Sequence, residues 1–189
     1  RLFNVESEAE LDNLARLAAE MGKHARAALR VNPDVDPKTH RYIATGKKET
    51  KFGVDLERAE RVFRTFVASP GARHVALEAV HLHIGSQITT AEPYVQAVTK
   101  ALALVRALRG AGLAVTALDI GGGFAADYET GDALDADEFA KALVPLLAGA
   151  GLEIIMEPGR FIAGNSGILV TQVQYLKAGG ERKFVLVDS

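Results

Sequence analysis

Three polar motifs in this chain each follow a short apolar run, and helix-like stretches lie between them. The motifs are residues 81–87 (HLHIGSQ), 119–124 (DIGGGF) and 157–160 (EPGR). When strands alternate with helices in a parallel sheet or barrel, the residues that follow the strands meet at the carboxyl ends of those strands. The pattern therefore predicts an α/β fold with one site formed by all three motifs.

The alternation extends over most of the chain. Five apolar runs have the length of strands: residues 2–5, 27–31, 79–84, 115–120 and 153–156. Apolar residues at helical spacing predict four helices: from Ser7 to about Gly22, from Asp55 through Val67, from about Pro93 to Arg109, and from Asp135 through Leu147. Ser7 and Glu10 have the spacing of a helix capping box. The polar residues 32–51 predict a long surface loop.

The pattern changes after residue 167. Residues 168–176 and 184–187 look like two strands joined by a turn at Gly179 and Gly180, with no helix between them. We therefore divide the chain into a barrel-type domain, residues 1–166, and the start of an antiparallel β domain, residues 167–189.

The number of βα units points to an incomplete barrel. Five units fall short of the eight that close a (β/α)8 barrel of typically ~250 residues. The chain also does not begin with methionine. We expect a partial TIM-type barrel from a longer enzyme, incomplete at its amino-terminal side. An open five-stranded sheet is the alternative.

Composition limits the classes of function. The net charge of −2 gives no electrostatic support for nucleic-acid binding, and the apolar runs fall far short of the ~20 residues of a membrane span. The chain has no cysteine, which excludes disulfides, thiolate nucleophiles and thiolate metal sites within it. We expect a cytoplasmic protein with neither nucleic acid nor membrane as a partner.

The glycine motif is typical of an anion site. The backbone N–H groups of Gly121, Gly122 and Gly123 are expected to converge on a phosphate. Ser86 can donate its hydroxyl to the same group. A flexible turn is the alternative interpretation.

His81 and His83 are two residues apart, so we expect their side chains on one side of the strand. They could bind a metal, His83 could stack on a flat ring, or both could be structural. A metal would need further ligands at strand ends, and the other histidines fall in linkers or loops. We therefore expect no metal.

Glu157 follows an apolar strand, where a carboxylate is costly unless it has a partner. The partner could be a protein cation such as Arg160, or a protonated pyridine nitrogen. In the second case the carboxylate would make the ring a strong electron sink. Arg160 would then contact a phosphate or a substrate carboxylate.

Two further basic regions remain open. Arg30 closes the second strand, and is either a contact to a cofactor ring oxygen or an ordinary strand-end charge. Lys47, Lys48 and Lys51 are most simply solvated. Residues 51–53 (KFG) are the one part of that loop that could belong to a site or an interface.

Together with residues 30–33 (RVNP) and 51–53, the three motifs resemble the pyridoxal-phosphate-dependent decarboxylases of the alanine-racemase-like barrel fold. The resemblance covers essentially the whole chain and implies pyridoxal 5'-phosphate as the cofactor. Residues 32–40 (NPDVDPKTH) and 83–87 (HIGSQ) favour decarboxylation of meso-diaminopimelate to L-lysine. Ornithine, arginine or a carboxylated polyamine such as carboxynorspermidine is the alternative substrate.

The resemblance also implies a role for each site residue. His83 would stack on the cofactor ring, Glu157 would bind its pyridine nitrogen, and Arg30 would lie near its phenolic oxygen. The phosphate would be held by Ser86, Gly121, Gly122, Gly123, Pro158, Gly159 and Arg160. Arg160 would also help to bind the substrate, and His83 and Glu157 would be catalytic. Racemases of this fold have arginine in place of Glu157.

Two parts expected of that family do not occur in the sequence. One is the Schiff-base lysine, found in a Lys-x-Asn motif on a strand that would precede Arg1. The other is a cysteine-containing segment of the β domain, supplied across a homodimer. We therefore expect the parent enzyme to be a homodimer, and this chain alone to be inactive. A non-catalytic homologue and a metal-dependent hydrolase are the remaining alternatives.

Overall fold

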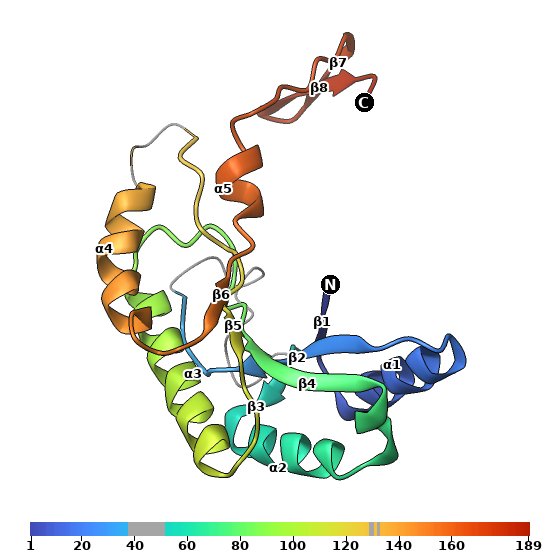
Figure 1. Ribbon diagram of the computed structural model, residues 1–189. Helices are drawn as coiled ribbons and strands as arrows, with labels where there is room; N and C mark the ends of the chain where they lie inside the picture. The colour runs from blue at the N-terminus through green and yellow to red at the C-terminus, as the bar shows by residue number, and fades with distance from the viewer. Residues whose placement is uncertain (38–51, 129–130, 132) are drawn as a thin grey trace.

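The computed structural model describes residues 1–37, 52–128, 131 and 133–189. Its centre is a curved parallel sheet with the strand order β1-β2-β4-β5-β6 (Figure 1). The strands are β1 (Leu2–Val5), β2 (Ala25–Asn32), β4 (Val75–His81), β5 (Ala117–Asp119) and β6 (Glu153–Ile155). The five predicted strands are thus confirmed, and β1 and β6 are the two edges of the sheet. A further short strand, β3 (Val54–Asp55), pairs with β2 and was not predicted.

Four long helices connect the strands and lie along the outer side of the curved sheet (Figure 1). They are α1 (Glu8–Glu20), α2 (Leu56–Val67), α3 (Glu92–Gly110) and α4 (Ala136–Leu147). Two short helices, η1 (Pro70–Arg73) and α5 (Gly159–Ala163), were not predicted. Strands inside and helices outside form part of a (β/α) barrel, and among the described residues no further strand of this sheet pairs beyond β1 or β6.

The helix starts follow from local chemistry. The Ser7 hydroxyl accepts a hydrogen bond from the Glu10 N–H, and the Asp135 carboxylate accepts one from the Glu138 N–H. Each satisfies a donor that a helix start leaves unpaired. Asp55 precedes α2 as expected, but its side chain makes no capping hydrogen bond.

The main apolar core lies between the sheet and the helices. Leu29, Val80 and Leu118 are adjacent in register on β2, β4 and β5, and all three are fully buried. They belong to one cluster that also contains Phe63 of α2 and Tyr94 of α3. Burial of each such large apolar side chain contributes about 1.5–3 kcal/mol. This packing holds the ends of the strands in fixed relative positions.

The inner face of the sheet differs from the outer one. Ala28, Ala79 and Ala117 lie side by side on β2, β4 and β5 and are fully buried. Because methyl groups are short, this row leaves room for longer polar side chains to reach across the interior.

The predicted boundaries of the third and fourth strands were wrong at both ends. The third strand, β4, begins at Val75 rather than Ala79 and ends at His81 rather than Ile84. A β-bulge lies at Glu78, because Ala27 pairs with Leu77 and Ala28 pairs with Ala79. The prediction took only the apolar run after Glu78 as the strand. The fourth strand is Ala117–Asp119 instead of residues 115–120.

The last residues form an antiparallel hairpin of β7 (Val173–Gly179) and β8 (Arg182–Val187). The prediction began its first strand at residue 168, but residues 168–172 are not part of the strand. All residues of both strands are exposed, and the hairpin projects away from the sheet (Figure 1). Of the predicted loop at residues 32–51, residues 33–37 have no regular structure, and 38–51 lie outside the described part.

None of the helices in the described residues is both long and apolar enough to cross a membrane.

Candidate active site

The register of the sheet brings the polar residues together at one end of the strands. Arg30 of β2 pairs with His81 of β4, and His81 pairs with Asp119 of β5. Glu157 follows β6 by two residues, so it extends from the neighbouring strand at the same end. This is the carboxyl end of the parallel sheet, where sites of this fold class form. The three motifs therefore meet, as the sequence predicts.

The glycine segment, residues 121–123, packs so closely that no side chain fits. A Cβ atom at Gly122 would lie 2.1 Å from the Glu157 carbonyl oxygen. At Gly123, where φ is +96°, a Cβ atom would lie 2.1 Å from the Gly85 carbonyl oxygen. The hydroxyl of Tyr94, which lies in α3, donates a hydrogen bond to the Gly122 carbonyl at 2.9 Å and so holds the segment in place. These glycines join the three motifs by direct backbone contact.

Two of the three glycine N–H groups are used inside the protein. The Gly121 N–H donates to Asp119 Oδ1 at 2.9 Å, and the Gly122 N–H donates to His83 Nδ1 at 3.3 Å. The expected convergence of all three N–H groups on an anion is therefore not what the structure has. Within the described residues, the Gly123 N–H makes no hydrogen bond to the protein and is the donor left for a ligand.

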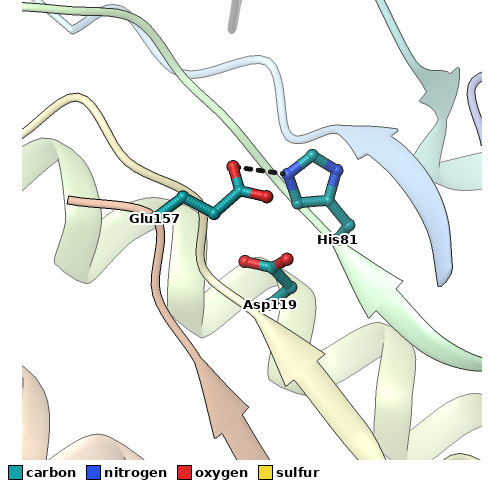
Figure 2. Close-up of side chains that lie close together, drawn as sticks. All are labelled: His81, Asp119 and Glu157. Atoms are coloured by element: carbon teal, nitrogen blue, oxygen red, sulfur yellow. Dashed lines mark ion pairs between the residues drawn. The ribbon is translucent and has the colours of Figure 1, made fainter. Parts of the chain in front are cut away.

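Four side chains, Asn4, His81, Asp119 and Glu157, form a polar cluster on the inner face of the sheet. Figure 2 shows three of them, His81, Asp119 and Glu157, converging from neighbouring strands. His81 Nε2 lies 3.7 Å from Glu157 Oε2. The Asn4 side-chain amide donates to Asp119 Oδ2 at 3.2 Å and to Glu157 Oε1 at 3.1 Å.

The cluster has unusual proton affinities. Burial lowers the pKa of His81 to about 4, so its ring is neutral at pH 7. Burial and the neighbouring Asp119 carboxylate raise the pKa of Glu157, and Arg30 and Asn4 oppose that rise. The His81–Glu157 contact drawn in Figure 2 is thus not an ion pair at neutral pH. Neither ring nitrogen of His81 has a hydrogen-bond partner among the described residues.

Acid is expected to destabilise the fold through His81. Between pH 6.5 and about 4 the unfolded chain protonates this histidine and the folded protein does not, so the free energy of unfolding falls as the pH falls. The total loss is about 3 kcal/mol at 1.36 kcal/mol per pKa unit. Urea unfolding at pH 7 and pH 4.5 measures it.

His81→Gln is the matched variant for this pH dependence, because glutamine does not titrate. Between pH 7 and pH 4.5, the free energy of unfolding should decrease less for this variant than for the unaltered protein. Equal losses in both proteins would contradict the assignment to His81.

Arg160, the protein cation named above as a possible partner of Glu157, does not pair with it. The Arg160 guanidinium donates from Nε to Ser86 Oγ at 3.1 Å and from Nη1 to Tyr128 Oη at 3.0 Å. Ser86 follows β4 and Arg160 lies in α5, so this contact joins two of the motifs. Two hydroxyls and a guanidinium form a group of donors suited to an anion.

Arg30 points into the same end of the sheet and is held there. Its side chain is 12% exposed, and Nη1 lies 2.5 Å from Glu6 Oε1. The Gly53 N–H donates to the other Glu6 oxygen at 3.2 Å, and the Arg30 guanidinium lies 5.0 Å from the centre of the Phe52 ring. Residues 52 and 53 thus belong to the site region, whereas Lys51, Lys47 and Lys48 lie outside the described residues.

His83 faces the glycine segment with a half-buried ring. Burial, with a smaller contribution from Arg30, lowers its pKa, which favours the neutral ring. Since Nδ1 accepts the Gly122 N–H, the proton of the neutral ring lies on Nε2. A flat neutral ring in this position is suited to stacking.

Histidine and carboxylate are also the side chains that bind divalent metals. Ligand atoms of His81, Asp119 and Glu157 lie within 4.8 Å of one another. The sequence argument against a metal rested on a shortage of such neighbours, and the structure supplies two of them. Our expectation of no metal therefore stays a prediction, and elemental analysis of the purified protein tests it.

Several residues of the site were not identified from the sequence. Asn4 and Glu6 lie in or just after β1, Asp119 was part of a quoted motif without a role, and Tyr128 lies in the loop after the glycine segment. Only Asp119 gave a usable signal, because a carboxylate at the end of an apolar strand needs a partner. The contacts of the other three span more than 20 residues of sequence, so no local pattern reveals them.

Comparison with known proteins shows which family this chain matches. Residues 1–164 match the family described as pyridoxal-dependent decarboxylase, pyridoxal binding domain. A diaminopimelate decarboxylase of Aquifex aeolicus is 46% identical over 189 residues, which are 100% of this chain and 44% of that relative.

Solved structures give the same result. The chain resembles diaminopimelate decarboxylase from Helicobacter pylori complexed with L-lysine, with a TM-score of 0.85, 39% identity, and coverage of 98% of this chain and 46% of the other. The enzyme from M. jannaschii, also with L-lysine, has a TM-score of 0.82 and 31% identity, with coverage of 100% and 45%. The chain therefore spans less than half the length of these relatives.

Proposed function

Because this chain belongs to the pyridoxal-dependent decarboxylases, through the pyridoxal binding domain of that family, we propose that it forms the larger part of the cofactor site of an amino-acid decarboxylase. The single observation that carries the proposal is the position of Glu157. Its carboxylate lies on the inner face of the sheet, hydrogen-bonded to Asn4 instead of paired with Arg160.

The residues fit pyridoxal phosphate. A Cβ atom on Gly122 or Gly123 would collide with the carbonyl oxygen of Glu157 or Gly85, so only glycine lets this segment lie against the other two motifs. The Gly123 N–H, Ser86 and Arg160 would hold the phosphate, with the turn at Pro158 and Gly159 beside them. His83 would stack on the ring, and Arg30 would face its phenolic oxygen.

Glu157 would bind the pyridine nitrogen. When bound, the cofactor supplies a protonated ring that takes up the electron pair left as the α-carboxylate departs as carbon dioxide. An ionised Glu157 stabilises the ring proton, because a carboxylate next to a cation favours the charged forms of both. His83 orients the ring, and Arg160 has the geometry to bind a carboxylate of the substrate.

We propose meso-diaminopimelate as the substrate and L-lysine as the product. The support is that relatives 39–46% identical bear the name diaminopimelate decarboxylase, and that the two solved structures described above hold L-lysine. Decarboxylation removes one carboxylate of the substrate as carbon dioxide and adds a proton at the same carbon, which leaves lysine.

We further propose that this chain is part of a longer protein. The β1 and β6 edges are open, and apolar side chains beside β6 are exposed, including Met156 and Ile162. Residues 1–166 would be the barrel domain, and the hairpin at 167–189 the start of an antiparallel β domain. The Schiff-base lysine would come from elsewhere in the full-length protein, which we propose is a cytoplasmic homodimer.

The test is product formation by the full-length protein with pyridoxal phosphate. We expect L-lysine and carbon dioxide from meso-diaminopimelate, and at least about 100-fold lower kcat/KM with ornithine, arginine or carboxynorspermidine, because a site built for a polar group rejects analogues without it. A preference for one of these would overturn the substrate assignment. No turnover of any of them would favour a non-catalytic homologue.

The isolated chain is the second arm of this test. We expect no lysine from meso-diaminopimelate when the 189-residue chain alone is supplied with cofactor. If the isolated chain formed measurable L-lysine, it would not need a Schiff-base lysine residue from elsewhere in the full-length protein.

A further inference from the structure

We propose that Asn4 is a positioning residue for Glu157, and that it ties this carboxylate to Asp119 across the inside of the barrel. The inference rests on the proposed function, in which Glu157 faces the cofactor's pyridine nitrogen. Asn4 itself would touch neither cofactor nor substrate; it would act by fixing where the Glu157 carboxylate lies and whether it is ionised.

The hydrogen bond between Asn4 and Glu157 joins side chains from strands that do not pair with each other. Asn4 lies on β1 and Glu157 follows β6, and these are the two opposite edges of the sheet. Asn4 is in register with Ala28 of β2, at the head of the row of alanines on the inner face. Because these side chains are methyl groups, the Asn4 amide reaches over them to the far strands. A larger residue in the row would block this path.

The chemistry of the contact is specific to an amide. The side-chain NH2 group of asparagine can donate two hydrogen bonds, and the Asn4 amide nitrogen lies 3.2 Å from Asp119 Oδ2 and 3.1 Å from Glu157 Oε1. Both acceptors are carboxyl groups, which fixes the amide orientation with its nitrogen toward them. A donor shared by two carboxylates offsets their mutual repulsion and holds them together.

Asp119 extends the connection to the phosphate side of the site. Its other oxygen, Oδ1, accepts the Gly121 N–H at 2.9 Å. One chain of hydrogen bonds therefore runs from the glycine segment through Asp119 and Asn4 to Glu157. These hydrogen bonds fix the distance between two parts of the site. One part would hold the phosphate, and the other is the carboxylate that would bind the ring nitrogen.

Three other groups face Glu157 and must be considered with Asn4. Asp119 from β5 raises the pKa of Glu157, and Arg30 from β2 lowers it. His81 from β4 is neutral at pH 7 and contributes no charge. Asn4 donates a hydrogen bond to Glu157 without carrying a charge, and this hydrogen bond favours the ionised carboxylate.

The first measurement needs no cofactor. In the full-length protein labelled with 13C at glutamate carboxyl groups, with the Glu157 signal assigned from Glu157→Gln, Asn4→Ala should raise the titration midpoint of Glu157 by about one pH unit, the effect of one hydrogen bond to a charged group. Asn4→Asp keeps the shape of the side chain but replaces the amide donor by a carboxyl group, and should raise the titration midpoint of Glu157 further. Asn13→Ala, on the exposed side of α1, is the matched control and should leave it unchanged. An unchanged midpoint in both Asn4 variants would overturn the proposal.

The second measurement uses two ligands, pyridoxal phosphate and its 1-deaza analogue, in which the ring nitrogen is replaced by C–H. Asn4→Ala should weaken binding of pyridoxal phosphate about tenfold and leave the analogue within twofold, since the analogue offers Glu157 no nitrogen. In a Glu157→Gln background, Asn4→Ala should have no further effect. Equal weakening of both ligands, or additive effects, would mean that Asn4 is merely structural. If the unaltered protein bound neither ligand, the proposed function would fail, and the carboxyl titration would still decide the role of Asn4.

Discussion

Replacing Gly123 by alanine is expected to abolish binding of pyridoxal phosphate and to lower the free energy of unfolding by about 3 kcal/mol or more. The new Cβ atom would lie 2.1 Å from the Gly85 carbonyl oxygen and 3.1 Å from the Tyr94 hydroxyl. The residue would also keep φ near +96°, which is strained for alanine. Both neighbours are firmly held, so the glycine segment must move out of place. Cofactor titration and urea unfolding of the full-length protein measure the two effects.

Gly110→Ala is the matched control. Gly110 ends α3, has no atom within 4 Å of an added Cβ, and does not require positive φ. Alanine favours helix, so this variant should bind cofactor normally and be unchanged or stabilised by up to about 1 kcal/mol. Normal cofactor binding by Gly123→Ala would show that the segment is a flexible turn without a role in the site.

Glu157→Gln is expected to lower kcat for lysine formation by about 10²–10³-fold, while cofactor still binds. Glutamine has the same shape but no charge, so the protonated ring would lose the group that stabilises its charge. Losing one preorganised electrostatic contact of this kind costs catalysis a factor of this size. The phosphate contacts of Ser86 and Arg160 are untouched by the change. Steady-state kinetics with meso-diaminopimelate, at saturating cofactor, measures the effect.

Glu153→Gln provides the comparison, because Glu153 lies on the strand that Glu157 follows. Glu153 begins β6, and its exposed carboxylate accepts a hydrogen bond from Arg26 at the opposite end of the sheet from Glu157. An exposed pair of this kind contributes little to stability, and we expect less than a twofold change in kcat. Comparable kcat values for Glu157→Gln and the unaltered protein would remove the basis of the proposed reaction.

The elements that the sequence predicted well are those with strong local signals. The helices at 8–20 and 136–147 begin where Ser7 and Asp135 accept hydrogen bonds from residues three positions later. The glycine segment and Glu157 could be placed at strand ends because each directly follows an apolar run. Such features depend on neighbours within about four residues, which a sequence displays.

The errors have physical causes of a different kind. The predicted strand began too late because the polar Glu78 interrupts the apolar residues of β4, and the structure accommodates Glu78 in a bulge within the strand. Residues 168–172 are apolar enough for a strand, but a strand also needs a partner in register, and β8 pairs from Val173 onward. The glycine N–H groups were expected to face a ligand, but Asp119 and His83 accept two of them.

The sequence by itself determined the class of fold, the strand ends that carry the chemistry, and the kinds of side chain present there. Only the tertiary structure decided which of those side chains meet: Arg160 with Ser86 and Tyr128, and Glu157 with Asn4. Asn4 and Glu157 are 153 residues apart, and their contact depends on the curvature of the sheet and on the row of small alanines between its edges. Local propensity acts over a few residues, whereas a site across a curved sheet is formed by the packing of the whole domain.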